Sequence, residues 1–220
     1  MTIIAISGSP SATSRTQRLL SHLLSLLERD GLKTSLLPLF SLPGDAMIQA
    51  NVTAPEIAST LSDIDKANVV IVGTPIYKAA YSGLLKIFLD LLPQRGLDGK
   101  IVLPIATGGS EAHLLALDYA LRPVLQSLGA DIVLPSVYAL DRDIVWNADG
   151  NVSLDDPLRA RVCDAAQQIG TFVERLYVRP YTATKGMCIE STAKIAALTC
   201  IASPVSLPAQ RNERPFTKHS

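Results

Sequence analysis

The sequence is short of cysteine and has no long apolar run, and each absence excludes a class of protein. The three cysteines are widely spaced and form no Cys-x-x-Cys motif or Cys/His cluster. Neither a disulfide framework nor a metal site is therefore expected, and free thiols are typical of a reducing compartment. No apolar stretch reaches the roughly 18 residues that span a bilayer, so we expect no membrane association. Residues 1–6 lack the positive flank and long apolar core of a signal peptide, which favours a cytoplasmic location.

The sequence also lacks a net charge, because its 20 Lys and Arg residues balance its 20 Asp and Glu residues. This balance argues against a nucleic-acid-binding protein, which needs a basic face. The charges are unevenly distributed: residues 1–178 carry 14 basic and 18 acidic side chains, and residues 179–220 carry 6 and 2. Arg179-Pro180 interrupts the last predicted helix. We therefore expect one domain over residues 1–178 and a flexible C-terminal extension over 179–220.

Five short apolar segments alternate with stretches of helical periodicity. The segments predicted as strands cover residues 3–6, 34–37, 69–72, 101–106 and about 131–139. Five helices are predicted. The first contains residues 19–27, the second begins at Pro55, and the third covers about 82–92. The fourth runs from Ser110 to about 128, and the fifth covers about 155–176. Residues 39–54 are expected to be a loop, and a loop or hairpin is expected around 147–150. Apolar strands alternating with helices predict an α/β fold with a doubly wound, flavodoxin-like, five-stranded parallel sheet in the order 2-1-3-4-5.

Ligands of such sheets bind at the carboxyl ends of the strands, near the point where the strand order reverses. This rule selects the loops after the first, third and fourth strands. The first of them is rich in hydroxyls and leads directly into a helix. Ser9, Ser14, Arg15 and Thr16 are the candidates for binding a phosphate there, because a helix N-terminus, hydroxyls and a guanidinium together bind phosphate well. The alternative is a capped helix behind a solvated serine-rich turn.

The second loop begins with Pro75, which stiffens the chain as it leaves the strand. Ile76 and Tyr77 are predicted to wall a planar heteroaromatic ring, with Lys78 near the polar edge of that ring. Lys78 and Arg15 are also the candidates for a phosphate of NADPH. For Tyr81, which follows, helix or subunit packing is the favoured interpretation.

The third loop is Thr107-Gly108-Gly109-Ser110. Its two glycines let backbone N–H groups approach a ring edge closely, although a strand-to-helix turn with Ser110 as the helix N-cap is the alternative. Taken together, the three loops provide a phosphate site, a ring wall and a ring edge, and this combination indicates FMN. Donors at one edge of a flavin stabilise its reduced form.

The sequence resembles the NADPH-dependent FMN reductases of the flavodoxin-like superfamily over about residues 1–177. The motifs that carry the resemblance are Ser7-Gly8-Ser9-Pro10, Ser14-Arg15-Thr16, Gly73-Thr74-Pro75-Ile76-Tyr77, Gly83-Leu84-Leu85-Lys86 with Asp90, and Ala106-Thr107-Gly108-Gly109-Ser110. Residues 75–83 and 113–125 are similar to the reductases of two-component alkanesulfonate monooxygenase systems. The resemblance implies hydride transfer from NADPH to FMN, delivery of reduced flavin to a monooxygenase during sulfur limitation, and a homodimer or homotetramer. Since hydride passes directly between two bound rings, no catalytic side chain is expected.

Pro123 lies inside the predicted fourth helix, where its ring crowds the carbonyl of Tyr119. A kink or single π-helical turn around Tyr119 is therefore predicted. The resemblance implies that such a turn lies at a subunit interface beside the flavin, where Tyr119 is a possible gate. A proline-kinked packing helix is the alternative.

Two rival functions remain. A quinone or azo-dye reductase would use the same pocket with tightly held FMN and an organic acceptor. A non-enzymatic electron carrier usually needs a strongly acidic docking face, which zero net charge makes the poorer explanation.

Overall fold

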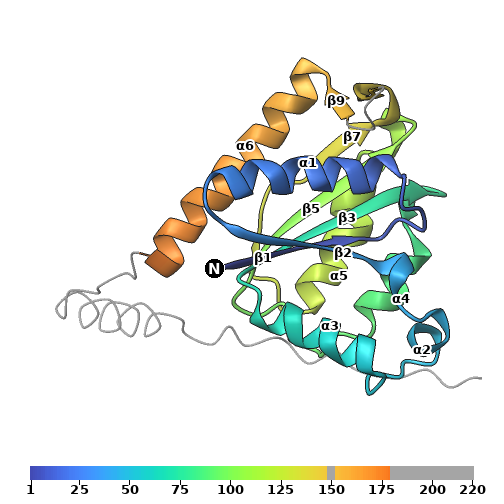
Figure 1. The fold of residues 1–220 in the computed structure, drawn as a ribbon. Coiled ribbons are helices and arrows are strands. Elements are labelled where there is room, and N and C mark those ends of the chain that lie inside the picture. The colour runs from blue at the N-terminus through green and yellow to red at the C-terminus, as the bar shows by residue number, and fades with distance from the viewer. Residues whose placement is uncertain (148–151, 179–220) are drawn as a thin grey trace, which may run out of the picture. The chain divides into compact units, whose positions relative to one another are not determined.

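A parallel sheet covered by helices on both faces makes up the part of the chain that the computed structural model describes, residues 1–147 and 152–178 (Figure 1). The strands are β1 (Thr2–Ser7), β2 (Lys33–Pro38), β3 (Val69–Tyr77), β4 (Ala80–Tyr81), β5 (Ile101–Gly108), β6 (Ile132–Val133), β7 (Val137–Leu140), β8 (Ile144–Trp146) and β9 (Val152–Leu154). The predicted extension at 179–220, and residues 148–150 of the predicted loop or hairpin, lie outside the described residues.

The parallel strands follow the order β2-β1-β3-β5-β6, which confirms the predicted topology. The predicted fifth strand is split into β6 and β7, which both pair with β5. The break lies at Pro135, because proline cannot donate a backbone hydrogen bond. The guanidinium of Arg122 lies at this break. It donates to the carbonyls of Val133 and Leu134 at 3.4 Å and to Ser136 Oγ at 3.2 Å.

The helices cover the sheet in two layers. They are α1 (Arg15–Arg29), α2 (Gly44–Ile48), α3 (Pro55–Lys66), α4 (Gly83–Leu89), α5 (Arg122–Ser127) and α6 (Asp156–Val173), with 3-10 turns at Leu39–Ser41, Glu111–His113 and Asp141–Asp143 and π-helical turns at Leu117–Leu121 and Glu174–Val178. Helices α1 and α6 pack on one face, and α3, α4 and α5 on the other (Figure 1). No helix within residues 1–147 and 152–178 has the length and apolar character needed to cross a membrane.

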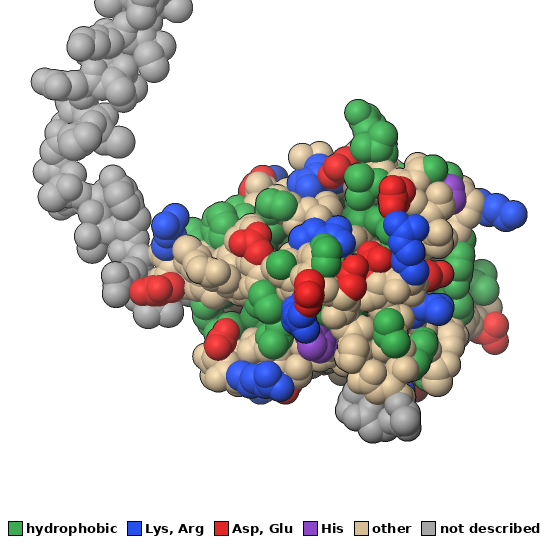
Figure 2. All heavy atoms as spheres, turned by 90° about the horizontal axis from the view of Figure 1, so that it is seen from above, with side chains coloured by type: hydrophobic (Ala, Val, Ile, Leu, Met, Phe, Trp, Pro, Cys, Tyr) green, Lys and Arg blue, Asp and Glu red, His purple; other side chains and the backbone are tan. Residues whose placement is uncertain are grey.

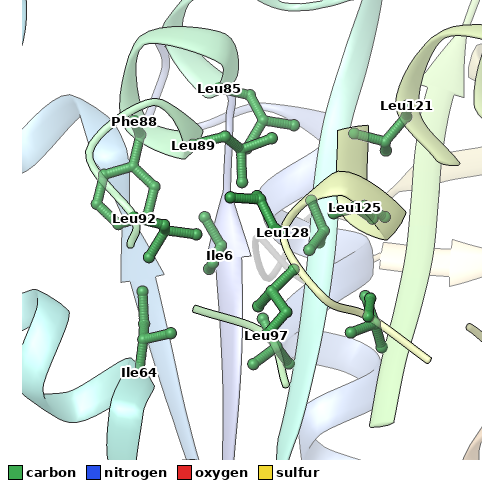
Figure 3. Packing of buried hydrophobic residues seen from close by; sticks show 14 of the residues in the cluster. Ile6, Ile64, Leu85, Phe88, Leu89, Leu92, Leu97, Leu121, Leu125 and Leu128 are labelled. Atoms are coloured by element: carbon green, nitrogen blue, oxygen red, sulfur yellow. The ribbon is translucent and has the colours of Figure 1, made fainter. Parts of the chain in front are cut away.

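Alternate residues of β1 show how the apolar strands fill both layers. Ile3 packs with the side chains of α1 and α6, whereas Ile6 packs on the opposite face. Figure 3 shows Ile6 among side chains from three helices, including Ile64 of α3, Phe88 of α4 and Leu125 of α5. A strand buried on both faces has few positions that face solvent, so most of its residues are apolar and the strand is recognisable in the sequence.

On the α1 and α6 side, acidic and basic side chains are interspersed (Figure 2). This mixture matches the nearly balanced charge of residues 1–178, which carry 14 basic and 18 acidic side chains.

The structure corrects the expectation of a loop over residues 39–54. This stretch contains a 3-10 turn and the helix α2, anchored by the buried side chains of Leu39 and Met47. Elements of three to five residues are too short to show helical periodicity.

Two strands are longer than predicted. Strand β3 continues to Tyr77 and β5 to Gly108, because Pro75 pairs with Thr107 in the parallel ladder. Most of the second and third loops is therefore strand.

Candidate flavin site

A cavity of about 210 Å³ lies at the carboxyl ends of the parallel strands. Its lining residues are Ser9, Thr13, Ser14, Arg15, Thr16, Pro75, Ile76, Tyr77, Thr107, Gly108, Gly109, Asp141 and Trp146. The structure thus brings together residues of all three loops that the switch-point rule selected. Of the predicted site residues, Lys78 and Ser110 do not line the cavity.

The first loop ends in a capped helix. Ser14 Oγ accepts a hydrogen bond from the backbone N–H of Gln17 at 3.1 Å, and so it is the N-cap of α1. Ser9 is buried, and its Oγ accepts from the N–H of Ser11 at 3.3 Å. Arg15 Nε is buried and has no hydrogen-bond partner among the described residues. A buried guanidinium N–H without a partner is costly, and a bound anion would satisfy it.

The first and second loops are tied together by short hydrogen bonds. The N–H of Gly8 donates to the carbonyl of Gly73 at 2.7 Å, and Ser82 Oγ donates to the carbonyl of Gly8 at 2.6 Å. Ser82 Oγ also accepts from the N–H of Leu85 at 3.1 Å, so it caps α4 as well. A Cβ atom at Gly8 would lie only 2.8 Å from Leu85 Cβ. Glycine is needed there because a side chain would push the loop away from α4.

The second loop forms a hairpin, which the sequence did not predict. Ile76 and Tyr77 pair with β4 in the antiparallel sense, and Lys78 and Ala79 form the two-residue turn with φ of 50° and 64°. Left-handed backbone at two consecutive residues is typical of a type I′ turn and is strained for residues other than glycine. Lys78 therefore stands at the tip of the turn, while the side chain of Tyr77 remains 52% exposed beside the cavity.

The third loop is joined to α1 through Thr107. Its Oγ1 lies 2.6 Å from Thr16 Oγ1, and both side chains are buried. Ser110 caps the following 3-10 turn, because its Oγ accepts from the N–H of Ala112 at 3.2 Å. The alternative interpretation of Ser110, a helix cap, is thus the one that the geometry supports.

Tyr138 explains the glycine at position 108. Tyr138 Oη donates to the carbonyl of Ser110 at 2.6 Å, and a Cβ atom at Gly108 would clash with this hydroxyl. Burial, with a further contribution from the charge of Asp141, raises the pKa of Tyr138, so the hydroxyl keeps its proton and remains a donor. Neither Gly108 nor Gly109 has a positive φ, so close packing, and not a left-handed conformation, requires glycine at position 108.

Three lining residues were not predicted from the sequence, namely Thr13, Asp141 and Trp146. Thr13 belongs to the hydroxyl-rich first loop. Asp141 follows β7, and one of its carboxylate oxygens lies 3.8 Å from the place that a Cβ of Gly109 would occupy. Trp146 lies on β8, and the guanidinium of Arg18 lies 5.6 Å from the centroid of its indole ring. The one sequence feature that could have indicated a role for Trp146 is that it is the only tryptophan in the sequence.

The π-helical turn predicted around Tyr119 is present at Leu117–Leu121. Pro123 does not interrupt a continuous helix but lies in the first turn of α5, where its missing N–H is tolerated. Tyr119 is 79% exposed, and Leu114, one turn earlier, is 51% exposed. The turn packs beside β4 of the second loop.

Within the described part of the chain, no group of His, Cys, Asp and Glu side chains is arranged to hold a metal ion. The side-chain donors around the cavity are mainly hydroxyls and the guanidinium of Arg15, and Asp141 adds one carboxylate. Such donors suit a phosphate and the polar edge of an uncharged ring.

Comparisons with known proteins agree with this chemistry. The chain is 38% identical to an FMN reductase (NADPH) of Pseudomonas putida, covering 86% of this chain and 95% of that protein. It is 42% identical to an FMN reductase (NADPH) of Escherichia coli, covering 66% and 76%. The crystal structure of the apo form of an NADH:FMN oxidoreductase aligns with a TM-score of 0.70 and 37% identity, covering 78% of this chain and 89% of that one. Residues 1–144 match the family described as NADPH-dependent FMN reductase, and the chain belongs to that family.

Proposed function

We propose that this NADPH-dependent FMN reductase supplies reduced FMN to a monooxygenase, in the cytoplasm, for the release of sulfur from alkanesulfonates. The observation that supports release of the reduced flavin is the size of the cavity at the carboxyl ends of the strands, which we call the flavin cavity. At about 210 Å³, it is smaller than the roughly 300–1,000 Å³ of pockets that bury most of a drug-sized ligand. A flavin held there by one chain stays accessible, which suits a reductase that releases it.

The phosphate of FMN is assigned to the first loop. Arg15 provides a buried N–H that has no partner among the described residues, and Ser9, Ser14 and Thr16 surround the start of α1. The partial positive charge of the helix N-terminus adds to this attraction. Since the Oγ atoms of Ser9 and Ser14 already accept backbone hydrogen bonds, their hydroxyl hydrogens remain to be donated to phosphate oxygens.

The ring is assigned to the second and third loops. Tyr77 and Ile76, stiffened by Pro75, wall one side, and residues 107–109 lie along an edge. Bound FMN supplies the redox chemistry, since it accepts a hydride from the nicotinamide of NADPH. The side chains around the cavity position the two rings and exclude competing reactions.

We also propose that the chain assembles as a homodimer or homotetramer through the surface around the π-helical turn. Leu114, Leu115 and Tyr119 are 51%, 57% and 79% exposed on this surface. Clustered apolar side chains of this size usually mark an interface. Because the turn packs beside β4, a second copy on this surface would contribute to enclosing the flavin cavity, with Tyr119 placed to gate it.

A coupled assay tests the proposed function. Purified protein, NADPH and a low concentration of FMN are combined with an alkanesulfonate monooxygenase and an alkanesulfonate, and sulfite is measured. We expect sulfite release that depends on all components, and NADPH oxidation that needs added FMN and turns over many times per chain.

Two results would contradict the proposal. If the protein purifies with bound FMN and oxidises NADPH only when a quinone or azo dye is added, the rival reductase is correct. If it reduces added FMN but the monooxygenase releases no sulfite, the assignment to alkanesulfonates is wrong although the reductase activity stands.

A further inference from the structure

A second cavity lies beside α1 and has a volume of about 290 Å³. It is lined by five residues of α1 and one of β9, namely Arg18, Ser21, His22, Ser25, Arg29 and Val152. We call it the α1 groove. None of the residues predicted from the sequence for either nucleotide lies in it.

The two arginines and the histidine of the α1 groove share one helix face. His22 is four residues after Arg18, and Arg29 is eleven residues after Arg18. Both spacings return to the same side of a helix. At 1.5 Å per residue, the face from Arg18 to Arg29 is about 16 Å long. This length is sufficient for one half of a dinucleotide.

The chemistry of the α1 groove suits an oxyanion. Arg18 and Arg29 provide guanidinium groups, and no Asp or Glu is among the lining residues. Arg18 Nε is buried and has no hydrogen-bond partner among the described residues. Burial, and secondarily the charge of Arg29, lowers the pKa of His22, so that near neutral pH the imidazole is uncharged and keeps one N–H to donate.

The α1 groove adjoins the flavin cavity at Trp146, which pairs with Val152 of the groove in the β8–β9 ladder. The guanidinium of Arg18, which lines the groove, lies 5.6 Å from the ring centroid of Trp146, which lines the flavin cavity. An extended ligand with one end in the flavin cavity would therefore pass Trp146 and contact Arg18 before it enters the α1 groove.

We propose that the α1 groove binds the phosphorylated adenosine of NADPH, with His22 and Arg29 holding its 2′-phosphate and Arg18 lying between that phosphate and the flavin cavity. The proposal rests on the activity of the family, in which NADPH is the reductant. The 2′-phosphate is the only group that NADH lacks, so a cationic groove at this point selects NADPH. A structural relative is described as an NADH:FMN oxidoreductase, which shows that relatives differ in the coenzyme they use.

Direct binding is measured first, by isothermal titration calorimetry with saturating FMN, so that the phosphate loop is already filled. The ligands are adenosine 2′,5′-bisphosphate and AMP. We expect the bisphosphate to bind at least tenfold more tightly, since hydrogen bonds between charged groups typically contribute that much. Arg29→Met and His22→Gln should remove most of this difference, and Arg29→Lys should restore part of it.

Steady-state kinetics with saturating FMN form the second measurement. In Arg29→Met, kcat/KM for NADPH should fall about tenfold, while kcat/KM for NADH stays within twofold. Lys66→Met is the matched control, because Lys66 is an exposed cation on α3, on the opposite face of the sheet. It should change neither value.

Equal losses with both coenzymes, or no loss with either, would overturn the proposal. So would binding of the bisphosphate that disappears when FMN is present, which would place it in the flavin cavity. An increase in the KM of FAD alone would assign the groove to the adenosine of a flavin dinucleotide instead. A wild-type protein that reduces FMN with neither coenzyme would count against the family activity itself, a result distinct from failure of the groove.

Discussion

Thr16 and Thr107 are 91 residues apart in the sequence, yet their hydroxyl oxygens lie 2.6 Å apart in a buried hydrogen bond. The bond joins the first turn of α1 to the end of β5, and both residues line the flavin cavity. It fixes the distance between the loop assigned to the phosphate and the loop assigned to the ring edge.

The bond should contribute measurably to stability. Thr107→Val leaves the Thr16 hydroxyl buried without a partner and should lower the free energy of unfolding by about 1–3 kcal/mol. Thr16→Val should have a similar effect. The double variant should lose less than the sum of the two, because neither position then holds an unpaired polar group. Urea denaturation of all four proteins measures the coupling, and strictly additive losses would show that the hydroxyls do not interact.

Gly108 and Tyr138 are coupled by close packing, because the tyrosine hydroxyl occupies the space that a side chain at position 108 would need. Gly108→Ala places a Cβ atom against Tyr138 Oη, and so it should displace the tyrosine and break its hydrogen bond to Ser110. We expect a loss of about 1–3 kcal/mol in stability, together with weaker FMN binding.

Tyr138→Phe removes the clashing atom, so it should recover part of the stability in the Gly108→Ala background although it is destabilising alone. Thermal unfolding of the single and double variants is the measurement. If the second substitution made the first worse, the clash would not be the cause.

The sequence predicted the parts of the fold that rest on local patterns. Apolar runs such as residues 69–72 and 101–106 indicated strands buried on both faces, and their alternation with helices favoured the doubly wound strand order. The proline at position 123 predicted a kink or π-helical turn around Tyr119, and the turn is present, although Pro123 itself is accommodated in the first turn of α5.

Features that depend on distant contacts were not predictable. The hairpin at residues 76–81 was missed because Lys78-Ala79 is not a sequence that favours a type I′ turn, so that packing overrides local preference. Trp146 and Asp141 line the cavity only because β7 and β8 carry them to the carboxyl end of β5. No local sequence pattern predicts that these two residues lie at the cavity.

The Lys78-Ala79 turn should be a site of stored strain. Two consecutive residues with φ near +50° to +64° cost about 1–2 kcal/mol each when they are not glycine. Lys78→Asn with Ala79→Gly provides the preferred type I′ sequence. We expect the melting temperature to rise by a few degrees, since each kcal/mol corresponds to about 2–4 °C in a domain of this size. An unchanged or lower melting temperature would mean that the hairpin does not hold this turn in solution.

Self-association should depend on the exposed surface around the π-helical turn. Substituting Leu115 and Tyr119 together by serine removes two large apolar side chains that are more than half exposed, so the monomer fold should survive. Light scattering after size exclusion should show a dimer or tetramer for the wild type and a smaller species for the variant. The exposed pair Val145 and Trp146 is not used as a control because Trp146 lines the flavin cavity. Ile48 of α2, which is 73% exposed, is suitable, and Ile48→Ser should leave the mass unchanged.

Arg15 provides the sharpest test of the flavin site, because FMN and riboflavin differ by one phosphate. Arg15→Met removes the unpaired guanidinium N–H and should raise the KM of FMN about tenfold or more, while the KM of riboflavin stays nearly constant. The measurement is NADPH oxidation at varied concentrations of each flavin. Lys33→Met is the control, since Lys33 is an exposed cation at the start of β2, at the opposite end of the strands from the cavity.

The comparison of the two flavins separates phosphate binding from a general disturbance of the cavity. A variant that loses affinity for both flavins equally would show that Arg15 supports the loop and does not bind the phosphate. In that case the buried Nε of Arg15 would need another partner, and the charge that neutralises the phosphate would have to come from outside the first loop. Retention of tight FMN binding in Arg15→Met would instead show that the hydroxyls and the helix N-terminus of the first loop bind the phosphate without the guanidinium.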